Sequence, residues 1–137
     1  MGYASPAVKW GYTGYIASAD VLATNAGEQT CASTSTPVTV WSGHWLEDVH
    51  ENSTIRFKCE LRKDGLGTAK LRIYIGGVEK YSVTEGNVAY TPQTTDLTVN
   101  WDRGDPIVVT LVSTVAGATS YVKNQSFCGI QSPIIMS

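Results

Sequence analysis

The sequence predicts an all-β protein, an antiparallel, jelly-roll-like β-sandwich with an extended N-terminal arm. Composition is the first reason, because 16 Thr accompany many Val, Ile and Tyr residues, and branched or aromatic side chains fit the half-buried surface of a sheet. The second reason is a strict alternation of apolar and polar residues in several segments. The third is the spacing of turn residues, which divides the chain into short strands about 8–12 residues apart, as is typical of a sandwich.

Length and charge narrow the class of protein. A chain of 137 residues can bury the core of one domain. With 42% hydrophobic and 16% charged residues it is neither a disordered chain nor a coiled coil. A net charge of −2 without a basic block argues against a nucleic-acid partner. No apolar run reaches the roughly eighteen residues of a membrane helix, so we predict no membrane partner either.

The first strands are predicted between residues 38 and 75. Residues 38–41 are predicted as a strand, and residues 54–62 alternate so strictly that a strand there has one apolar and one charged face. Residues 63–67 form a glycine-containing turn, and residues 70–75 alternate again. The two faces of the 54–62 strand are Ile55, Phe57, Cys59 and Leu61 inside, and Arg56, Lys58, Glu60 and Arg62 outside.

A hairpin is predicted next. Gly76–Gly77 is a two-residue loop signal, because the tightest hairpin turns need positive φ angles. Residues 78–84 return as the second strand, and a turn follows at residues 85–87. Residues 87–91 are predicted to form a short strand closed by Pro92, since proline cannot donate a hydrogen bond to a neighbouring strand.

Three more strands are predicted in the last third of the chain. Residues 96–101 alternate, and residues 102–106 form a turn rich in Asp and Gly. Residues 107–115 are predicted as the longest strand, and their apolar start suits either a central position in a sheet or a subunit contact. Residues 116–118 turn the chain, and residues 120–124 open the last strand.

We divide the chain into an N-terminal segment of residues 1–37, a sandwich of residues 38–128 and a C-terminal tail of residues 129–137. The first segment is rich in small residues with scattered Tyr and Trp, so it forms either the first strands of the sandwich or an extended arm that docks on a neighbouring subunit. The tail is apolar and interrupted by proline, so we expect a partner to cover it. The predicted partner-binding anchors are Trp10, Tyr12 and Tyr15 of the arm and Ile134 and Ile135 of the tail.

Three motifs follow one another in the predicted sandwich: Arg72–Val78, Trp101–Asp105 and Tyr121–Asn124. In this order they resemble the jelly-roll β-sandwich domains of virion proteins in tailed phages and related viruses, either capsid decoration proteins or tail-fibre modules. The resemblance covers a little over half of the chain and rests on turns and strand patterns, which indicate a fold better than a function.

The resemblance implies a non-enzymatic viral structural protein. Such a capsid decoration or minor capsid protein binds the assembled virion shell and stabilises it, because a subunit that binds only the assembled shell favours assembly by mass action. The expected partners are the major capsid protein or other virion proteins, the expected oligomer is a homotrimer, and the expected location is the virion of a bacteriophage, after synthesis in the host cytoplasm.

A second hypothesis is a carbohydrate-binding jelly-roll module or a tail-fibre receptor-binding domain. A flat aromatic ring complements the apolar face of a sugar, so exposed aromatic residues are candidates for a stacking platform. Cross-strand packing is the alternative use of such residues. The candidates are Trp41, Tyr74, Tyr81 and Tyr90.

We predict no catalytic, cofactor-binding or metal site. Residues 44–51 contain two His and three acidic residues, but their spacing matches no known metal motif. Asp102 and Asp105 are a further candidate pair for Ca²⁺. The Arg103–Asp105 tripeptide matches an integrin-binding motif and is explained more simply as a turn. A hydrolase would need converging polar groups, and no Gly-x-Ser-x-Gly motif presents a nucleophile.

The cysteines follow no C-x-x-C spacing, and their number is odd. Because the N-terminus shows no recognisable secretory signal, we expect free and mostly buried thiols. One disulfide with a third, free thiol stays open as the alternative. The three residues are Cys31, Cys59 and Cys128.

Overall fold

The computed structural model describes residues 13–44, 49–101 and 104–133, and the side chains of residues 22–44, 54–98 and 104–129. These parts of the chain contain nine strands and no helix, and therefore no helix that could cross a membrane. The strands are β1 (Thr13–Asn25), β2 (Gln29–Cys31), β3 (Val38–His44), β4 (Val49–Asp64), β5 (Ala69–Ile75), β6 (Val78–Glu85), β7 (Thr91–Trp101), β8 (Pro106–Ser113) and β9 (Thr119–Pro133).

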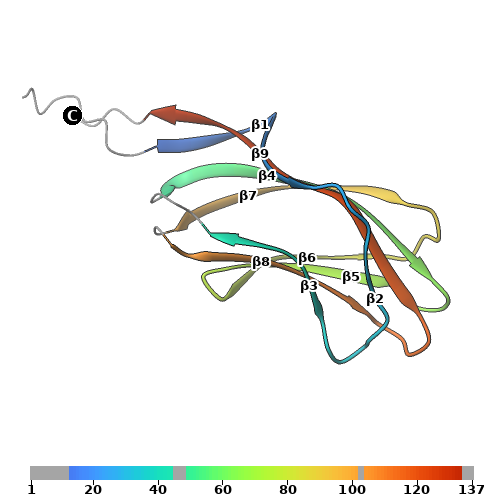
Figure 1. Ribbon diagram of the computed structural model, residues 1–137. Helices are drawn as coiled ribbons and strands as arrows, with labels where there is room; N and C mark the ends of the chain where they lie inside the picture. The colour runs from blue at the N-terminus through green and yellow to red at the C-terminus, as the bar shows by residue number, and fades with distance from the viewer. Residues whose placement is uncertain (1–12, 45–48, 102–103, 134–137) are drawn as a thin grey trace, which may run out of the picture.

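The strands form two sheets packed face to face (Figure 1). One sheet has five strands in the order β2-β9-β1-β4-β7, and β9 also pairs with β4; the other has four strands in the order β3-β8-β5-β6. All pairings are antiparallel except the contact of Thr13 in β1 with Val49 in β4, which is parallel. The predicted all-β sandwich is confirmed.

The core lies between the sheets, where alternate side chains of both meet. In β5 every second residue is buried, and β4 buries the four apolar residues that the sequence predicted to face inward. Aromatic contacts join the layers: the ring of Phe127 in β9 lies 4.8 Å from Trp41 in β3 and 4.9 Å from Phe57 in β4, measured between centroids. Removal of this apolar surface from water is the main stabilising contribution to such a sandwich.

The Gly76–Gly77 hairpin is confirmed. These two residues connect β5 to β6, and their φ angles are +59° and +81°. Two successive positive φ angles are the backbone of a type I′ turn, whose twist matches that of the strands it joins. Glycine adopts them without a steric penalty.

Part of the N-terminal segment belongs to the sandwich. Residues 13–25 form β1, which pairs with β9, and residues 29–31 form β2 at one edge of the same sheet. Of the two alternatives, residues 13–31 therefore follow the one in which they form the first strands of the sandwich. The long β9 makes this possible, because its backbone pairs with both β1 and β2. An extended arm could therefore consist only of residues 1–12, which lie outside the described residues.

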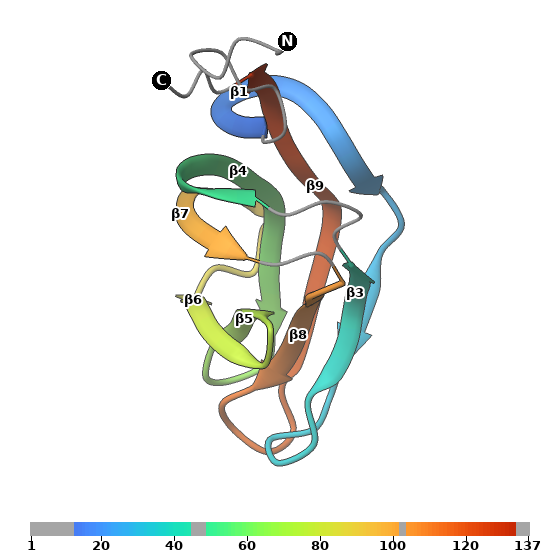
Figure 2. The same ribbon diagram turned by 90° about the vertical axis from the view of Figure 1, so that its left-hand side faces the viewer.

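The C-terminal boundary also differs from the expected one. β9 does not end at residue 128 but continues to Pro133, and its last residues pair with the start of β1 (Figure 2). The predicted tail thus begins as a strand, because β1 supplies partners for its backbone.

Two predicted strands are corrected. Residues 87–91 do not form a strand closed by Pro92: β7 begins at Thr91 and includes this proline. β7 is an edge strand, which has one side without a ladder, and there the missing N–H of proline is tolerated. The strand predicted at 107–115 is β8, which is central as expected but shorter than β4 and β9.

Candidate functional site

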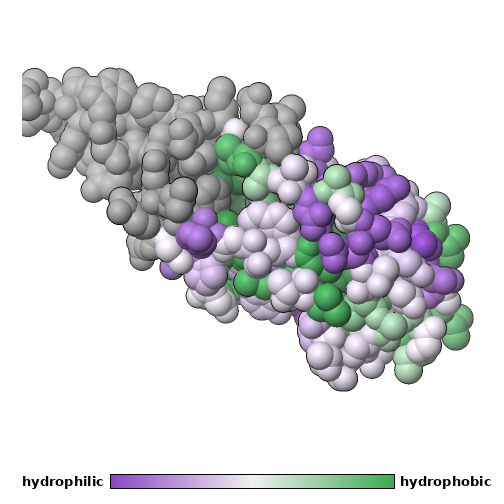
Figure 3. Space-filling model, viewed as in Figure 1, coloured by the Kyte–Doolittle hydropathy of each residue, from purple (hydrophilic) through white to green (hydrophobic). Residues whose placement is uncertain are grey.

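The outer face of the five-stranded sheet carries the predicted charged face of β4. Glu60 lies opposite Lys123 of β9, and Arg62 lies opposite Tyr121. On the other side, Lys58 lies opposite Thr94 of β7. Residues opposite each other in a sheet share a face, so polar side chains from three strands stand together. Hydrophilic residues gather along this sheet in the space-filling view (Figure 3).

A β-bulge in β9 shapes this face. The register of β9 against β4 shifts between Lys58 and Glu60, and within that shift Asn124 has a φ angle of +53°. The extra residue turns neighbouring side chains to opposite sides. Gln125 is fully buried in the core, whereas the side-chain amide of Asn124 donates a hydrogen bond to the carboxylate of Glu60 on the outer face.

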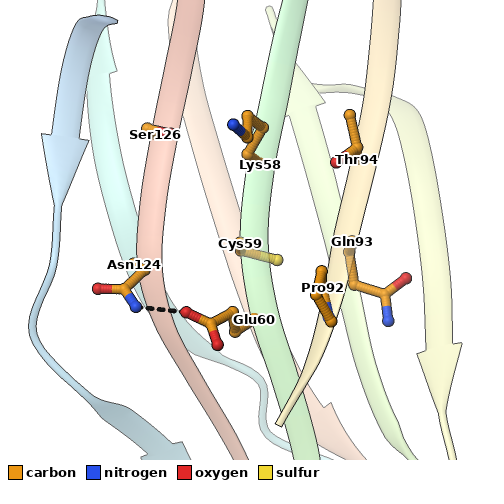
Figure 4. A pocket seen from close by; sticks show the side chains of 8 residues that line it. All are labelled: Lys58, Cys59, Glu60, Pro92, Gln93, Thr94, Asn124 and Ser126. Carbon is orange, nitrogen blue, oxygen red and sulfur yellow. Dashed lines mark hydrogen bonds between the residues drawn. The ribbon is translucent and has the colours of Figure 1, made fainter. Parts of the chain in front are cut away.

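A pocket of about 340 Å³ lies at the bulge (Figure 4). It presents amide, carboxylate, ammonium and hydroxyl groups beside the apolar ring of a proline, so it offers both hydrogen-bond donors and acceptors. The eight lining residues, called the sheet pocket below, are Lys58, Cys59, Glu60, Pro92, Gln93, Thr94, Asn124 and Ser126.

Next to the sheet pocket, two tyrosines are stacked with two cations. The guanidinium carbon of Arg62 lies 3.6 Å from the ring centroid of Tyr121 and 5.3 Å from that of Tyr90. The ammonium nitrogen of Lys123 lies 4.2 Å from the Tyr90 ring centroid. Cation–π attraction of this kind holds long side chains in one place. Lys123 precedes Asn124 and faces Glu60, so this ring–cation cluster adjoins the sheet pocket.

Tyr90 lies in the connection between β6 and β7, and its hydrogen-bond partner Glu28 lies in the connection between β1 and β2. The Tyr90 hydroxyl donates a hydrogen bond to the Glu28 carboxylate. Burial and this hydrogen bond together raise the pKa of Tyr90 to about 12, against the opposing influence of Arg62. The phenol therefore stays protonated and uncharged at neutral pH.

Cys59 lines the sheet pocket, but its chemistry is that of a neutral thiol. Burial, with a smaller contribution from nearby Glu60, raises the pKa of Cys59 to about 12. Because the thiolate is the reactive form, this cysteine is a poor nucleophile at neutral pH. All three cysteines are free and buried, as the sequence predicted.

The arrangement is suited to hold a polar ligand. The sheet pocket provides hydrogen-bonding groups on three strands, and the adjoining rings provide flat apolar surface. Small-molecule sites combine these two features. Within the described residues no group of three or more His, Cys, Asp or Glu side chains could hold a metal ion.

The predicted anchors are not brought to this site by any described contact. Trp10, Tyr12, Ile134 and Ile135 lie outside the described residues. Tyr15 lies in β1 opposite Gln131 of β9, and its side chain is among those not described. The anchor prediction stays a prediction.

The four candidate aromatic residues do not form one platform. Trp41 and Tyr81 point inward and pack against the core, whereas Tyr74 lies on the outer side of the four-stranded sheet, because its neighbours Ile73 and Ile75 are buried. Only Tyr90 adjoins the sheet pocket. Strand parity explains the separation, since successive side chains point to opposite faces.

Most of the polar candidates have side chains outside the described part of the chain. His44 is exposed at the end of β3, while Glu47 and Asp48 lie outside the described residues. Arg103 and Asp102 are also outside them. Gly104 has a φ angle of +85°, which supports the turn interpretation of the Arg103–Asp105 tripeptide.

Sequence reasoning missed the roles of Arg62 and Tyr121. Alternation did place Arg62 on the charged outer face of its strand, but pairing with β9 is not visible in a single sequence. The bulge at Asn124 was also missed. Its signal was an Asn in the middle of a strand, a residue that tolerates positive φ better than most.

Comparisons with known proteins agree on the fold. No family model matches the chain, and no curated protein matches it. Among solved structures, the CBM36-1 domain of a multidomain xylanase from the hindgut metagenome of Trinervitermes trinervoides aligns with a TM-score of 0.55 and 15% identity, over 74% of this chain and 77% of that chain. CBM stands for carbohydrate-binding module.

A second solved structure, the CBM22-1 and GH10 modules of Clostridium thermocellum xylanase 10B complexed with xylohexaose, aligns with a TM-score of 0.51 and 9% identity. That alignment covers 96% of this chain and 28% of that chain. At these identities the likeness shows the fold, a β-sandwich. Neither structure is a virion protein, so the predicted virion origin gains no support from them.

Proposed function

We propose that this chain is a carbohydrate-binding module that holds a glycan against the outer face of its five-stranded sheet. The observation that carries the proposal is the sheet pocket at the Asn124 bulge, flanked by the stacked rings of Tyr90 and Tyr121. Sugar hydroxyls need both donors and acceptors, which Asn124, Glu60 and Lys58 supply. Sugars also present apolar faces, and the two tyrosines supply ring surface beside the pocket, where Arg62 occupies one face of Tyr121.

The structural neighbours support this proposal over a role in a virion shell. One is a CBM36-1 domain of a xylanase, and the other is a structure with a CBM22-1 module complexed with xylohexaose. Xylose-containing polysaccharides are therefore the first ligands to test. The proposal gives the chain a binding role and no reaction.

The virion hypothesis stays a prediction with less support. Its capsid partners and its homotrimer rest on sequence resemblance. Its anchors at Trp10, Tyr12, Tyr15, Ile134 and Ile135 rest on the composition of the two ends of the chain. A tail-fibre receptor-binding domain would bind its glycan through a surface such as the sheet pocket, so the same binding experiment bears on that alternative.

Isothermal titration calorimetry with xylohexaose and soluble xylans tests the proposal. We expect saturable binding by the wild type and a loss of about fivefold or more in Tyr121→Ala, because one stacked ring contributes on the order of 1 kcal/mol or more beyond its buried area. Asn124→Gly removes the amide but keeps a residue suited to positive φ, and should also weaken binding.

Tyr74→Ala is the matched control, since it removes a tyrosine from the outer face of the opposite sheet. It should bind as the wild type does. Wild-type affinity in both Tyr121→Ala and Asn124→Gly, or no binding to any polysaccharide in a broad glycan panel, would contradict the proposal.

A further inference from the structure

The ring–cation cluster at the edge of the sheet pocket contains two cations that form no described ion pair, although the charge of Glu28 is close enough to act on Arg62. The ion pairs among the described residues are Arg56 with Asp96 and Arg72 with Glu79. Neither includes Arg62 or Lys123, although both approach the ring of Tyr90. Lys58, in the pocket itself, also has no ion pair within the described part of the chain.

The geometry of Arg62 keeps its donors free. A distance of 3.6 Å from the guanidinium carbon to the Tyr121 centroid is the van der Waals separation of two flat groups, so the guanidinium lies against the ring with its face. Its N–H groups lie in its own plane and point away from that ring. The ring of Tyr90 lies nearby, 5.3 Å from the guanidinium carbon, and several of the five donors of Arg62 remain available.

The nearby carboxylates are already engaged by uncharged donors. Glu28 accepts the Tyr90 hydroxyl, and Glu60 accepts the Asn124 amide. Both stay outside ion-pair distance of Arg62 and Lys123. The cluster thus holds two cations beside one ring, with no described carboxylate bound to either.

We propose that Arg62, assisted by Lys123, binds a carboxylate group of the ligand, so that the module prefers a polysaccharide that carries uronic acids. This inference rests on the proposed function and names its substrate class. A guanidinium is a planar fork that matches a carboxylate in two hydrogen bonds, and stacking on Tyr121 pre-organises it. The chain as a whole has a net charge of −2, so a preference for a polyanion must come from a local site such as this one.

The test compares each acidic polysaccharide with its own carboxyl-reduced form. The probes are glucuronoxylan, polygalacturonate and alginate, and calorimetry or affinity electrophoresis measures binding at low and moderate salt. We expect the wild type to bind at least one acidic polymer about tenfold more tightly than the reduced polymer, the effect of one charge-assisted interaction. Added salt should diminish the difference.

Variants assign the effect to Arg62. Arg62→Gln should remove the preference for the acidic form, and Arg62→Lys should retain part of it, because lysine keeps the charge but loses the fork. Lys70→Gln is the matched control, since it removes a cation from the outer face of the opposite sheet. Circular dichroism and urea denaturation check that each variant is folded.

The outcomes separate the two proposals. Equal binding of acidic and reduced polymers, with binding still weakened by Tyr121→Ala, would overturn the uronic-acid preference and leave carbohydrate binding intact. An acidic preference lost equally in Arg62→Gln and Lys70→Gln would also overturn it, as an effect of overall charge. No binding of any polymer would overturn both proposals.

Discussion

The outer faces of the two sheets are built from the same kind of alternating strands, yet they differ in shape. On the four-stranded sheet, β5 and β8 pair without any register shift, whereas the register of β5 with β6 shifts between Ile73 and Tyr74, next to the ion pair of Arg72 with Glu79 at 3.2 Å. On the five-stranded sheet, the bulge at Asn124 interrupts the pairing of β9 with β4, and the sheet pocket lies there.

The difference teaches how a sandwich acquires a binding site. At the register shift between β5 and β6, Arg72 forms an ion pair with Glu79, the ladder partner of Tyr74, so two long side chains of opposite charge meet there. A bulge adds one residue, re-aims the neighbouring side chains and opens space between strands. The connection that carries Tyr90 brings an aromatic ring against Lys123, the residue before the bulge at Asn124.

The largest expected effect is on the core that both faces share. Phe127→Ala removes the ring that contacts Trp41 of one sheet and Phe57 of the other. We expect a loss of about 3–5 kcal/mol in the free energy of unfolding, as for other buried aromatic residues. Urea denaturation measures it. A loss below 1 kcal/mol would show that this ring does not join the sheets as described.

The next prediction distinguishes the backbone conformation of Asn124 from the hydrogen bond of its side chain. Asn124→Ala places a residue with a Cβ atom at a φ angle of +53°, whereas Asn124→Gly relieves that constraint. We expect the alanine variant to be less stable than the glycine variant by about 1 kcal/mol in urea denaturation. Both lose the amide that bonds to Glu60, so both should weaken glycan binding. Equal stability of the two variants would contradict the role of positive φ.

A comparable effect on stability is expected far from the sheet pocket. Gly77→Ala puts a Cβ atom at a φ angle of +81° in the hairpin of the four-stranded sheet. We expect a destabilisation of about 1 kcal/mol with unchanged glycan affinity. Thermal unfolding and calorimetry measure the two quantities. A loss of affinity in this variant would show that the two outer faces are coupled.

The smallest effect concerns the exposed ion pair between Arg56 and Asp96, whose atoms lie 2.8 Å apart. The hydrogen bond from Arg56 lowers the pKa of Asp96. A lowered pKa in the folded state means that the stabilising contribution is present above the ordinary aspartate pKa of about 3.9 and is lost as the pH falls through the folded value.

Asp96→Asn should therefore be slightly less stable than the wild type at neutral pH, and the difference should vanish in acid. Urea denaturation at a series of pH values from neutral to strongly acidic measures this trend. A difference that grows as the pH falls would contradict the assigned sign. Since the pair is exposed, its removal should leave the fold and the sheet pocket unchanged.

Local patterns predicted much of the fold. The alternation of residues 54–62 identified the buried and the outer face of β4, and Gly76–Gly77 identified a hairpin. The prediction that Pro92 ends a strand was wrong, because proline interrupts a central strand but is tolerated in an edge strand. The sequence does not state that position, and β7 lies at an edge.

The candidate site was less predictable. The four aromatic residues chosen as a platform lie on different faces, and only Tyr90 adjoins the sheet pocket. Tyr121 is 31 positions later in the chain, and both rings lie beside Arg62 only because the connection after β6 comes close to β9. A single sequence contains no periodic signal for such a contact.

The amino-acid sequence by itself determined the class of structure and the direction in which most side chains of the strands point, because alternation with a period of two is a local property of an extended backbone. The tertiary structure decided which strands became neighbours, where β9 bulged and which cations met which rings. Those outcomes depend on the joint burial of apolar surface from distant segments. The N-terminal residues 13–31 show this dependence most clearly, since they form strands by pairing with β9 from the other end of the chain.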